Sequence, residues 1–272
     1  MKLCMIGTGY VGLVSGTCFA DIGNQVYCVD KDRSKIDKLN SGVSPIYEPG
    51  LDELIKKNYN ANRLIFTTDI KKAINYSDII FICVGTPTKK RSLKVDLSFV
   101  YKCVKEILNH TKKKKIIVTK STVPVGTGDE IEKIIKRKKK LFSVISNPEF
   151  LREGEAIRDF KYPDRIVIGS DNKSEFKIMR KLYSPLISKG AKFFTTSRKG
   201  AELIKYASNA FLATKITFIN EIANLCEKTG INVEDISLGI GSDSRIGSRF
   251  LRSGPAYGGS CFPKDTKGLV SA

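Results

Sequence analysis

The sequence has a single histidine, His110, and none of its seven cysteines belongs to a C-x-x-C pair. Structural zinc sites gather cysteine and histidine ligands at short spacings, and disulfide frameworks use paired cysteines, so neither is indicated. We therefore expect no metal. Unpaired thiols persist in a reducing compartment, and the cytoplasm is the expected location.

Long apolar runs and a secretion signal are also missing. No apolar stretch is long enough to cross a bilayer. Residues 1–6 enter a strand pattern directly and lack the charged, apolar and cleavage regions of a signal peptide. We expect no membrane partner. The 272 residues, of which 41% are hydrophobic, are enough for a packed core and suggest about two domains.

Acidic residues are fewer than basic ones, which gives the chain a formal net charge of +19 at pH 7. Lysine-rich runs at residues 112–115 and 136–140 each follow an amphipathic helical stretch and precede an apolar run, so both are expected to be exposed connections. Such charge either attracts a polyanion or a phosphorylated substrate, or simply forms a solvated surface. No aromatic residues interleave with these runs to stack on bases, so we expect no nucleic-acid partner.

Short β-rich runs alternate with helical periodicity over the first two thirds of the chain. This alternation is typical of a doubly wound parallel sheet of the Rossmann type. The predicted strands span residues 2–6, 25–30, 79–84, 115–119, 142–146 and 165–169, and helices such as 11–22 and 129–135 lie between them. The sequence therefore predicts an α/β fold, with a first domain over residues 1–198.

The pattern changes near Gly200, and residues 201–227 are predicted to form one long helix. Its apolar positions cover too wide a surface for one narrow stripe, so we expect it to be buried against more than one neighbour. Gly230 is a natural C-terminal stop, and a short helix is expected over residues 233–240. The second domain, residues 199–272, is therefore predicted to be all-helical.

A glycine motif of the kind that binds dinucleotides follows the first predicted strand and begins a helix: Gly7-Thr8-Gly9-Tyr10-Val11-Gly12. Gly7 permits the tight turn, Gly9 lets a pyrophosphate approach the backbone, and Gly12 allows the helix to pack closely on the strand. Asp30, at the end of the second strand, can accept hydrogen bonds from ribose hydroxyls and would repel a 2′-phosphate. The motif therefore predicts binding of NAD rather than NADP.

Cys261 lies between two glycines and a proline, in the run Gly258-Gly259-Ser260-Cys261-Phe262-Pro263-Lys264-Asp265. The glycines let the backbone approach a ligand, and Pro263 has the φ favoured at the first position of a helix. The helix dipole and the charge of Lys264 would favour the thiolate over the thiol. A nucleophile beside a nicotinamide cofactor would let an enzyme oxidise an alcohol through the aldehyde to the acid. The alternative is a small buried cysteine beside a turn.

Lys205 and Asn209 are four residues apart on the predicted long helix, so both project from one face. A lysine and an asparagine that converge on one point can stabilise an oxyanion and orient a hydroxyl. The alternative is a surface lysine, with its stem along the helix, beside a surface asparagine.

Other polar residues follow strands at the carboxyl edge of the predicted sheet, where ligands bind in open α/β folds. Glu149 and Glu153 follow the strand 142–146, and their carboxylates could position a water or bind sugar hydroxyls, or could simply favour a helix N-terminus. Thr122 and Thr86 also follow strands there, and neither hydroxyl is diagnostic alone.

Taken together, these segments resemble the UDP-glucose/GDP-mannose dehydrogenase family along the whole chain, and within it the UDP-glucose 6-dehydrogenase branch. The shared motifs are residues 7–12, 47–51, 84–87, 121–127, 147–154 and 163–169, the Lys205/Asn209 pair, and residues 258–265. The resemblance implies oxidation of the C6 hydroxyl of UDP-glucose to a carboxylate with two NAD molecules, in nucleotide-sugar metabolism and polysaccharide biosynthesis.

The resemblance also implies a role for each matching residue. Cys261 would attack the aldehyde to give a thiohemiacetal, and a second oxidation would give a thioester that water hydrolyses. Lys205 and Asn209 would stabilise the oxyanion, while Asp265 would form one unit with Cys261 and help to order the water. The implied catalytic residues are Cys261, Lys205, Asn209, Asp265, Glu153 and Thr122.

The implied binding residues form two sets. Those for NAD are Gly7, Gly9, Tyr10, Val11, Gly12, Asp30, Lys35, Thr86, Thr122, Glu153 and Lys264. Those for the nucleotide sugar are Glu149, Phe150, Leu151, Arg152, Glu153, Lys205, Asn209, Arg245, Phe250, Leu251, Arg252, Ser253, Gly254, Tyr257 and Gly258.

Arg245 resembles the arginine that reaches into the partner subunit's site, which implies a homodimer built on the long helix. Family members carry a further Rossmann-like domain that supplies part of the nucleotide-sugar site, and we expect this C-terminal UDP-binding domain to be absent from the chain. The nearest alternative substrate is GDP-mannose or another nucleotide sugar. The alternative functions are a two-electron hydroxyacid dehydrogenase and an NAD-binding fragment without turnover.

Overall fold

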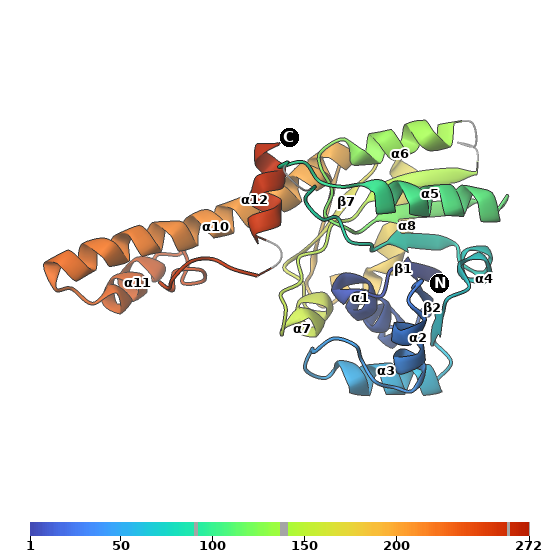
Figure 1. The fold of residues 1–272 in the computed structure, drawn as a ribbon, viewed down its shortest axis with the longest axis horizontal. Coiled ribbons are helices and arrows are strands. Elements are labelled where there is room, and N and C mark those ends of the chain that lie inside the picture. Colours follow the sequence, from blue (N-terminus) through green and yellow to red (C-terminus); the bar gives the residue numbers. More distant parts are fainter. Residues whose placement is uncertain (90–91, 137–140, 260–261, 272) are drawn as a thin grey trace. The chain divides into compact units, whose positions relative to one another are not determined.

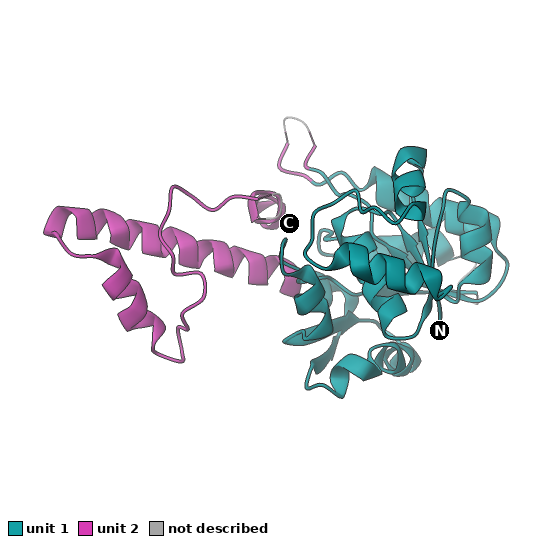
Figure 2. Cartoon of the chain, turned by 90° about the horizontal axis from the view of Figure 1, so that it is seen from below, with its two compact units in different colours: residues 1–87, 95–203 teal, residues 88–94, 204–272 magenta. Residues whose placement is uncertain are grey.

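The fold is that of a computed structural model, which describes residues 1–89, 92–136, 141–259 and 262–271. The chain divides into two compact units, one of residues 1–87 with 95–203 and the other of residues 88–94 with 204–272 (Figure 2). We describe each unit by itself.

The first unit is built on an eight-stranded sheet with the strand order β3-β2-β1-β4-β5-β6-β7-β8. The strands are β1 Lys2–Ile6, β2 Gln25–Val29, β3 Leu64–Thr67, β4 Ile79–Ile82, β5 Lys115–Thr119, β6 Phe142–Ser146, β7 Arg165–Gly169 and β8 Lys192–Thr196. Strands β3 to β6 in this order are parallel, whereas β7 runs antiparallel to β6 and parallel to β8. The carboxyl ends of β1, β2, β4, β5 and β6 therefore meet at one edge.

Helices cover both faces of this sheet (Figure 1). One face packs against α1 Tyr10–Asp21, α2 Arg33–Asn40, α3 Leu51–Asn60, α7 Ala156–Lys161, α8 Lys173–Leu182 and α9 Ser184–Ile187. The other packs against α4 Ile70–Tyr76, α5 Ser98–His110 and α6 Thr127–Ile135. The α/β doubly wound class predicted from the alternating pattern is confirmed.

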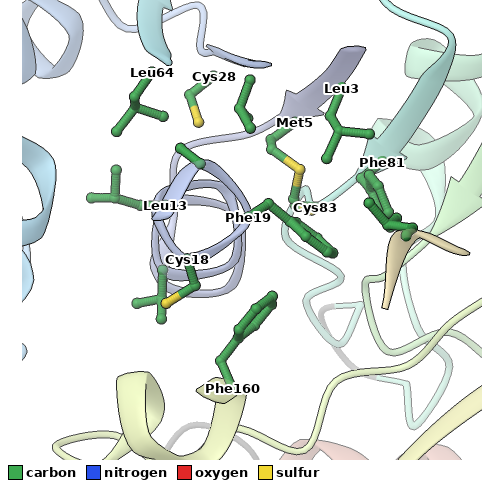
Figure 3. Close-up of a cluster of buried hydrophobic side chains, with 14 of the residues drawn as sticks. Leu3, Met5, Leu13, Cys18, Phe19, Cys28, Leu64, Phe81, Cys83 and Phe160 are labelled. Carbon is green, nitrogen blue, oxygen red and sulfur yellow. The ribbon is translucent and has the colours of Figure 1, made fainter. Parts of the chain in front are cut away.

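Side-chain alternation along β1 shows how the sheet is buried on both faces. Leu3 and Met5 enter the core on the α1 side, whereas Cys4 and Ile6 enter the core on the α5 side. Phe19 of α1 lies at the centre of the first core, with its ring centroid 5.2 Å from that of Phe81 and 4.9 Å from that of Phe160 (Figure 3). Buried α1 fixes the position of the turn that precedes it.

All six predicted strands are present, with β2 one residue and β4 two residues shorter at their C-terminal ends than predicted. Two strands were missed: β3 is only four residues long, and β8 is mostly exposed, so it lacks a buried apolar run. One strand departs from the predicted parallel sheet, because 165–169 runs antiparallel to its neighbour β6. Strand β7 pairs with β6 only where Gly169 lies opposite Ser146, so the residues that directly follow β6 stay at its carboxyl edge.

The second unit contains most of α10 Arg198–Thr229, together with α11 Val233–Gly241 and α12 Phe262–Val270. The long helix is confirmed, with three more residues at its start and two more at its end than predicted. Burial on more than one side is wrong for the single chain, because Phe211, Phe218 and Leu225 are 66%, 51% and 56% exposed. Among the described residues, no helix combines the length and apolarity needed to cross a bilayer.

Candidate functional site

The glycine motif forms a tight turn between β1 and α1. Gly7 has a φ of +102°, and a Cβ there would lie 2.7 Å from the Cys83 carbonyl oxygen. A Cβ on Gly12 would lie 1.9 Å from the Gly7 carbonyl oxygen. Helix α1 can therefore lie this close to the turn only because residue 12 is a glycine. A Cβ on Gly9, in contrast, would meet nothing within 4 Å. The space in front of Gly9 is open to a ligand.

Helix α1 begins at Tyr10, and no side chain caps its N-terminus or places an acidic group in its first turn. The first backbone N–H groups of a helix have no intrahelical acceptor, and the helix dipole is positive there. A pyrophosphate fits this end of α1 because it brings negative charge and acceptor oxygens to those groups. The turn therefore has the shape and the donors that NAD requires.

Asp30 follows β2 and lies beside this turn. Its Oδ2 accepts hydrogen bonds from the Thr8 backbone N and from Thr8 Oγ1, both at 2.9 Å, and its Oδ1 accepts from Asp32 N at 3.1 Å. Partial burial by itself would raise the pKa of Asp30, but these hydrogen bonds and the charge of Lys35 lower it. A fixed carboxylate that is ionised at neutral pH can accept from ribose hydroxyls and repels a 2′-phosphate.

Thr86 and Thr122, predicted from different strands, lie together at the carboxyl edge. The Thr86 hydroxyl donates to the Thr122 carbonyl oxygen at 2.8 Å, and both residues are buried. Ser121 Oγ donates to the carbonyl oxygens of Ile82 and Val84, at 3.2 and 2.7 Å. The loops after β4 and β5 are therefore held to each other by side-chain hydrogen bonds.

The segment after β6 contains buried and exposed groups. Glu149 is buried, and its carboxylate accepts from Leu151 N at 2.5 Å, whereas Glu153 is exposed. The Phe150 ring stacks under the Arg165 guanidinium at 4.0 Å. Arg152 donates to Asp159 from Nε at 3.0 Å and from Nη2 at 2.6 Å, so its guanidinium is paired with a carboxylate of the same segment.

A buried carboxylate from another loop holds this segment, and no role for it was predicted. Glu48 accepts hydrogen bonds from the Tyr10 hydroxyl, from Gly154 N at 2.9 Å and from Ile157 N at 3.3 Å. Burial and the hydrogen bond to Glu48 raise the pKa of Tyr10. Residues 47–51, Tyr47-Glu48-Pro49-Gly50-Leu51, are one of the motifs that carry the family resemblance, but the motif itself does not indicate which groups Glu48 binds.

Glu202, at the start of α10, is a second functional candidate that sequence reasoning missed. Its carboxylate accepts from Gly126 N at 2.7 Å, Gly128 N at 2.8 Å and Ser146 Oγ at 2.9 Å. Burial raises the pKa of Glu202, and these hydrogen bonds oppose the rise. One carboxylate therefore joins the loop that follows Thr122 to the end of β6.

Arg198 lies one turn earlier on α10, among acidic side chains. Its guanidinium contacts Asp129 at 2.9 Å, Asp171 at 2.6 Å and also Glu132. These three carboxylates are close enough to share a cation. Since a buried arginine already pairs with all three, the cluster has its counter-charge.

In the second unit, Lys205 and Asn209 are buried on α10 and so are not surface residues. Asn209 Nδ2 donates to Asp265 Oδ2 at 2.6 Å, and Lys264 Nζ contacts Asp265 Oδ1 at 2.5 Å. Helix α12 begins at Phe262, so Pro263 is its second residue and not its first. The prediction for Cys261 falls outside the described residues.

The predicted sugar-binding loop lies along the far part of α10. Gly254 N donates to Asn220 Oδ1 at 2.9 Å, and the rings of Phe250 and Tyr257 contact Phe262. Leu251 is buried, while Arg252 and Gly258 are exposed. A pocket of about 650 Å³ is lined by residues that include Asn220, Glu221, Asn224, Ser253, Gly254 and Tyr257. Arg245 is exposed and pairs with Asp243.

The chain is similar to a known protein family in both of its units. Residues 1–187 match the model of the UDP-glucose/GDP-mannose dehydrogenase family, NAD binding domain, and residues 199–272 match the central domain of the same family. The chain belongs to the UDP-glucose/GDP-mannose dehydrogenase family. Its first 187 residues are therefore the NAD-binding domain of a nucleotide-sugar dehydrogenase family, as the glycine turn and Asp30 indicate.

Individual members of the family are similar along the whole chain. The UDP-glucose 6-dehydrogenase of Rhizobium meliloti (strain 1021) is 57% identical over 275 residues, which cover 99% of this chain and 63% of that protein. A UDP-glucose dehydrogenase structure from Pyrobaculum islandicum is 37% identical with a TM-score of 0.93, over 99% of this chain and 63% of that one. A GDP-mannose dehydrogenase structure from Pseudomonas aeruginosa is 36% identical with a TM-score of 0.85, over 100% and 64%.

The chain is shorter than the family members that it matches. The chain spans 58% to 63% of the length of the curated relatives it matches. Within that length, the match reaches across both units of the structure.

Proposed function

We propose that this chain takes part in the NAD-dependent four-electron oxidation of UDP-glucose to UDP-glucuronate. The observation that carries the proposal is the buried hydrogen bond between Asn209 and Asp265, which joins the Lys205/Asn209 face of α10 to the helix that directly follows Cys261. Curated relatives that are 46% to 57% identical to the chain carry the name UDP-glucose 6-dehydrogenase, which supports this substrate.

The proposed domains are residues 1–198 for NAD and residues 199–272 for dimerisation and catalysis. NAD, when bound, accepts a hydride in each of the two oxidations. In the first domain, the α1 N-terminus binds its pyrophosphate and Asp30 its adenosine ribose, with Lys35, Thr86, Thr122 and Glu153 completing the site. Lys264 is proposed to contact the cofactor from the second domain.

The second domain supplies the covalent chemistry. The Cys261 sulfur adds to the carbonyl carbon of the aldehyde, and Lys205 and Asn209 stabilise the negative oxygen of the thiohemiacetal. Loss of a hydride from that carbon and a proton from its oxygen leaves a thioester. Water then attacks the thioester carbon and the C–S bond breaks, which releases the carboxylate and the thiol. Asp265, with Thr122 and Glu153, orders this water, and the carboxylates assist the removal of its proton.

The substrate and the product ratio test the proposal together. The 272-residue chain, and a version extended to the relatives' length, are given NAD with UDP-glucose or with GDP-mannose. We expect two NADH per UDP-glucose, and Cys261→Ser should bind NAD but form no acid. One NADH per sugar without a covalent adduct would identify a two-electron dehydrogenase. NAD binding without NADH formation by either version would identify a binding module.

GDP-mannose is the second candidate, because a GDP-mannose dehydrogenase structure has a TM-score of 0.85 with this chain. The sugar would lie against Glu149–Glu153, Lys205 and Asn209, and the loop of Phe250–Ser253 with Gly254, Tyr257 and Gly258 would bind the nucleotide. A higher kcat/KM with GDP-mannose than with UDP-glucose would reassign the substrate.

We also propose that two copies associate through α10, with Arg245 reaching the partner's site. Support comes from the apolar side chains of Phe211, Phe218 and Leu225, which are exposed on the single chain. Light scattering coupled to gel filtration should find a dimer, and Phe218→Glu should yield a monomer. A parental protein that elutes as a monomer at micromolar concentration contradicts this.

The described cysteines are all free and buried, which supports a reducing cytoplasm.

A further inference from the structure

Glu48 is a buried carboxylate, 6% exposed, in the loop 41–50 between α2 and α3. It belongs to neither the glycine turn nor the segment after β6, yet it contacts both. Its Oε2 accepts from the Tyr10 hydroxyl and from Gly154 N at 2.9 Å, and its Oε1 accepts from Ile157 N at 3.3 Å. The donors lie 38, 106 and 109 residues away in the sequence.

These contacts form a closed network around Tyr10. Gly154 N also donates to the Tyr10 oxygen at 3.0 Å, and the Tyr10 hydroxyl lies 3.3 Å from the Arg152 carbonyl oxygen. Burying a carboxylate is unfavourable unless donors replace its water, so the energy of Glu48 depends on all of these donors staying in place. A buried acceptor of this kind holds its donors in one arrangement.

Two of the three donors to Glu48, Tyr10 and Gly154, lie in or next to the proposed NAD site. Tyr10 is the first residue of α1, beside the open face of Gly9, and Gly154 directly follows Glu153. Glu153 itself is exposed, and its backbone belongs to the loop that Glu48 contacts through Gly154. Gly154 adopts a φ of +87°, and its N–H donates to Glu48.

We propose that Glu48 is a positioning residue, which holds the Glu153 loop against the N-terminus of α1 through Tyr10 and Gly154 and thereby sets the affinity for NAD. The proposal rests on the proposed function only in taking NAD as the cofactor. It needs no turnover and no sugar.

The test compares Glu48→Gln with Glu53→Gln, a change of the same kind at an exposed position in the first turn of α3. NADH affinity is measured by fluorescence titration, and the loop is probed by tryptic cleavage after Arg152. Gln has one acceptor oxygen where Glu has two, so at least one donor loses its partner. We expect Glu48→Gln to raise the Kd for NADH about tenfold and to speed that cleavage, with Glu53→Gln unchanged.

A purely structural role would lower the thermal midpoint of Glu48→Gln without changing its Kd at a temperature where it is folded, and that result overturns the proposal. If Glu48→Gln does not fold, Tyr10→Phe replaces it. This variant keeps the carboxylate and its two backbone donors but removes the hydroxyl link, and an unchanged Kd would equally overturn the proposal. The proposed oxidation can fail separately, as NADH binding by the parental chain without NADH formation from UDP-glucose.

Discussion

Asn209 donates a 2.6 Å hydrogen bond from its Nδ2 to Oδ2 of Asp265, and both side chains are buried. The other oxygen, Oδ1, contacts Lys264, so each oxygen of the Asp265 carboxylate has a donor. A Cβ on Gly268 would lie 2.7 Å from the Tyr206 ring, which shows how closely α12 approaches α10. The pair therefore fixes the helix that directly follows Cys261 to the helix that carries Lys205.

The Asn209–Asp265 bond should make a measurable contribution to the stability of the second unit. In a double-mutant cycle of Asn209→Ala and Asp265→Ala, followed by urea unfolding, we expect a coupling free energy of about 2 kcal/mol. The exposed pair of Arg245 and Asp243 is the control and should show no measurable coupling. Additive effects at Asn209 and Asp265 would contradict the assignment.

Two glycines of the same turn should respond to alanine in opposite ways. Gly12→Ala places a Cβ 1.9 Å from the Gly7 carbonyl oxygen and should destabilise the fold by about 3 kcal/mol. Gly9→Ala meets nothing within 4 Å, and its φ of −71° suits alanine, so the parental stability should persist. The new methyl nevertheless occupies the proposed pyrophosphate space, and the Kd for NADH should rise about tenfold or more. If Gly9→Ala binds NADH with the parental affinity, the pyrophosphate does not bind in front of Gly9 and the prediction is contradicted.

Asp30 should decide between NADH and NADPH. Asp30→Ser removes the carboxylate that is fixed by Thr8, so NADH affinity should fall about tenfold while NADPH affinity rises. Asp32→Asn is a matched control, since it removes a nearby charge but keeps an acceptor for Lys35 N. Fluorescence titration of both variants with both dinucleotides gives the answer. An equal loss of affinity for the two in Asp30→Ser would mean that Asp30 only supports the turn.

The parts of the fold and site that were predictable from sequence are those with a local signal. The turn at Gly7–Gly12 and Asp30 lie within one β-α-β unit, where residue type, spacing and strand order agree. The direction of β7 was not predictable, because a buried apolar run looks the same in either direction. Glu48 and Glu202 were missed because their partners are mainly backbone N–H groups far along the chain, which leave no mark on residue type.

Glu202 should make the protein more stable as the pH falls. Burial raises the pKa of Glu202 above its ordinary value of 4.5, so protonation is more favourable in the folded chain than in the unfolded one. Its contribution is complete below pH 4.5 and is lost as the pH rises through the raised pKa. The free energy of unfolding in urea should therefore change more with pH in this range for the parental protein than for Glu202→Gln, because glutamine cannot ionise. The same pH dependence in both would assign the effect to other groups.

Asp21 should act in the opposite direction. Partial burial alone would raise its pKa, but hydrogen bonds from Lys161 and Lys57 outweigh burial and lower it from 3.8 to about 2. Its contribution to stability is present above pH 3.8 and is lost as the pH falls through 2. The side chain is only 10% exposed, so Asp21→Asn should destabilise the protein by about 2 kcal/mol near neutral pH and hardly at all in strong acid. Asp37→Asn, in an exposed pair with Arg33, should change the unfolding free energy little at either pH, and an equal effect of the two substitutions would contradict the prediction.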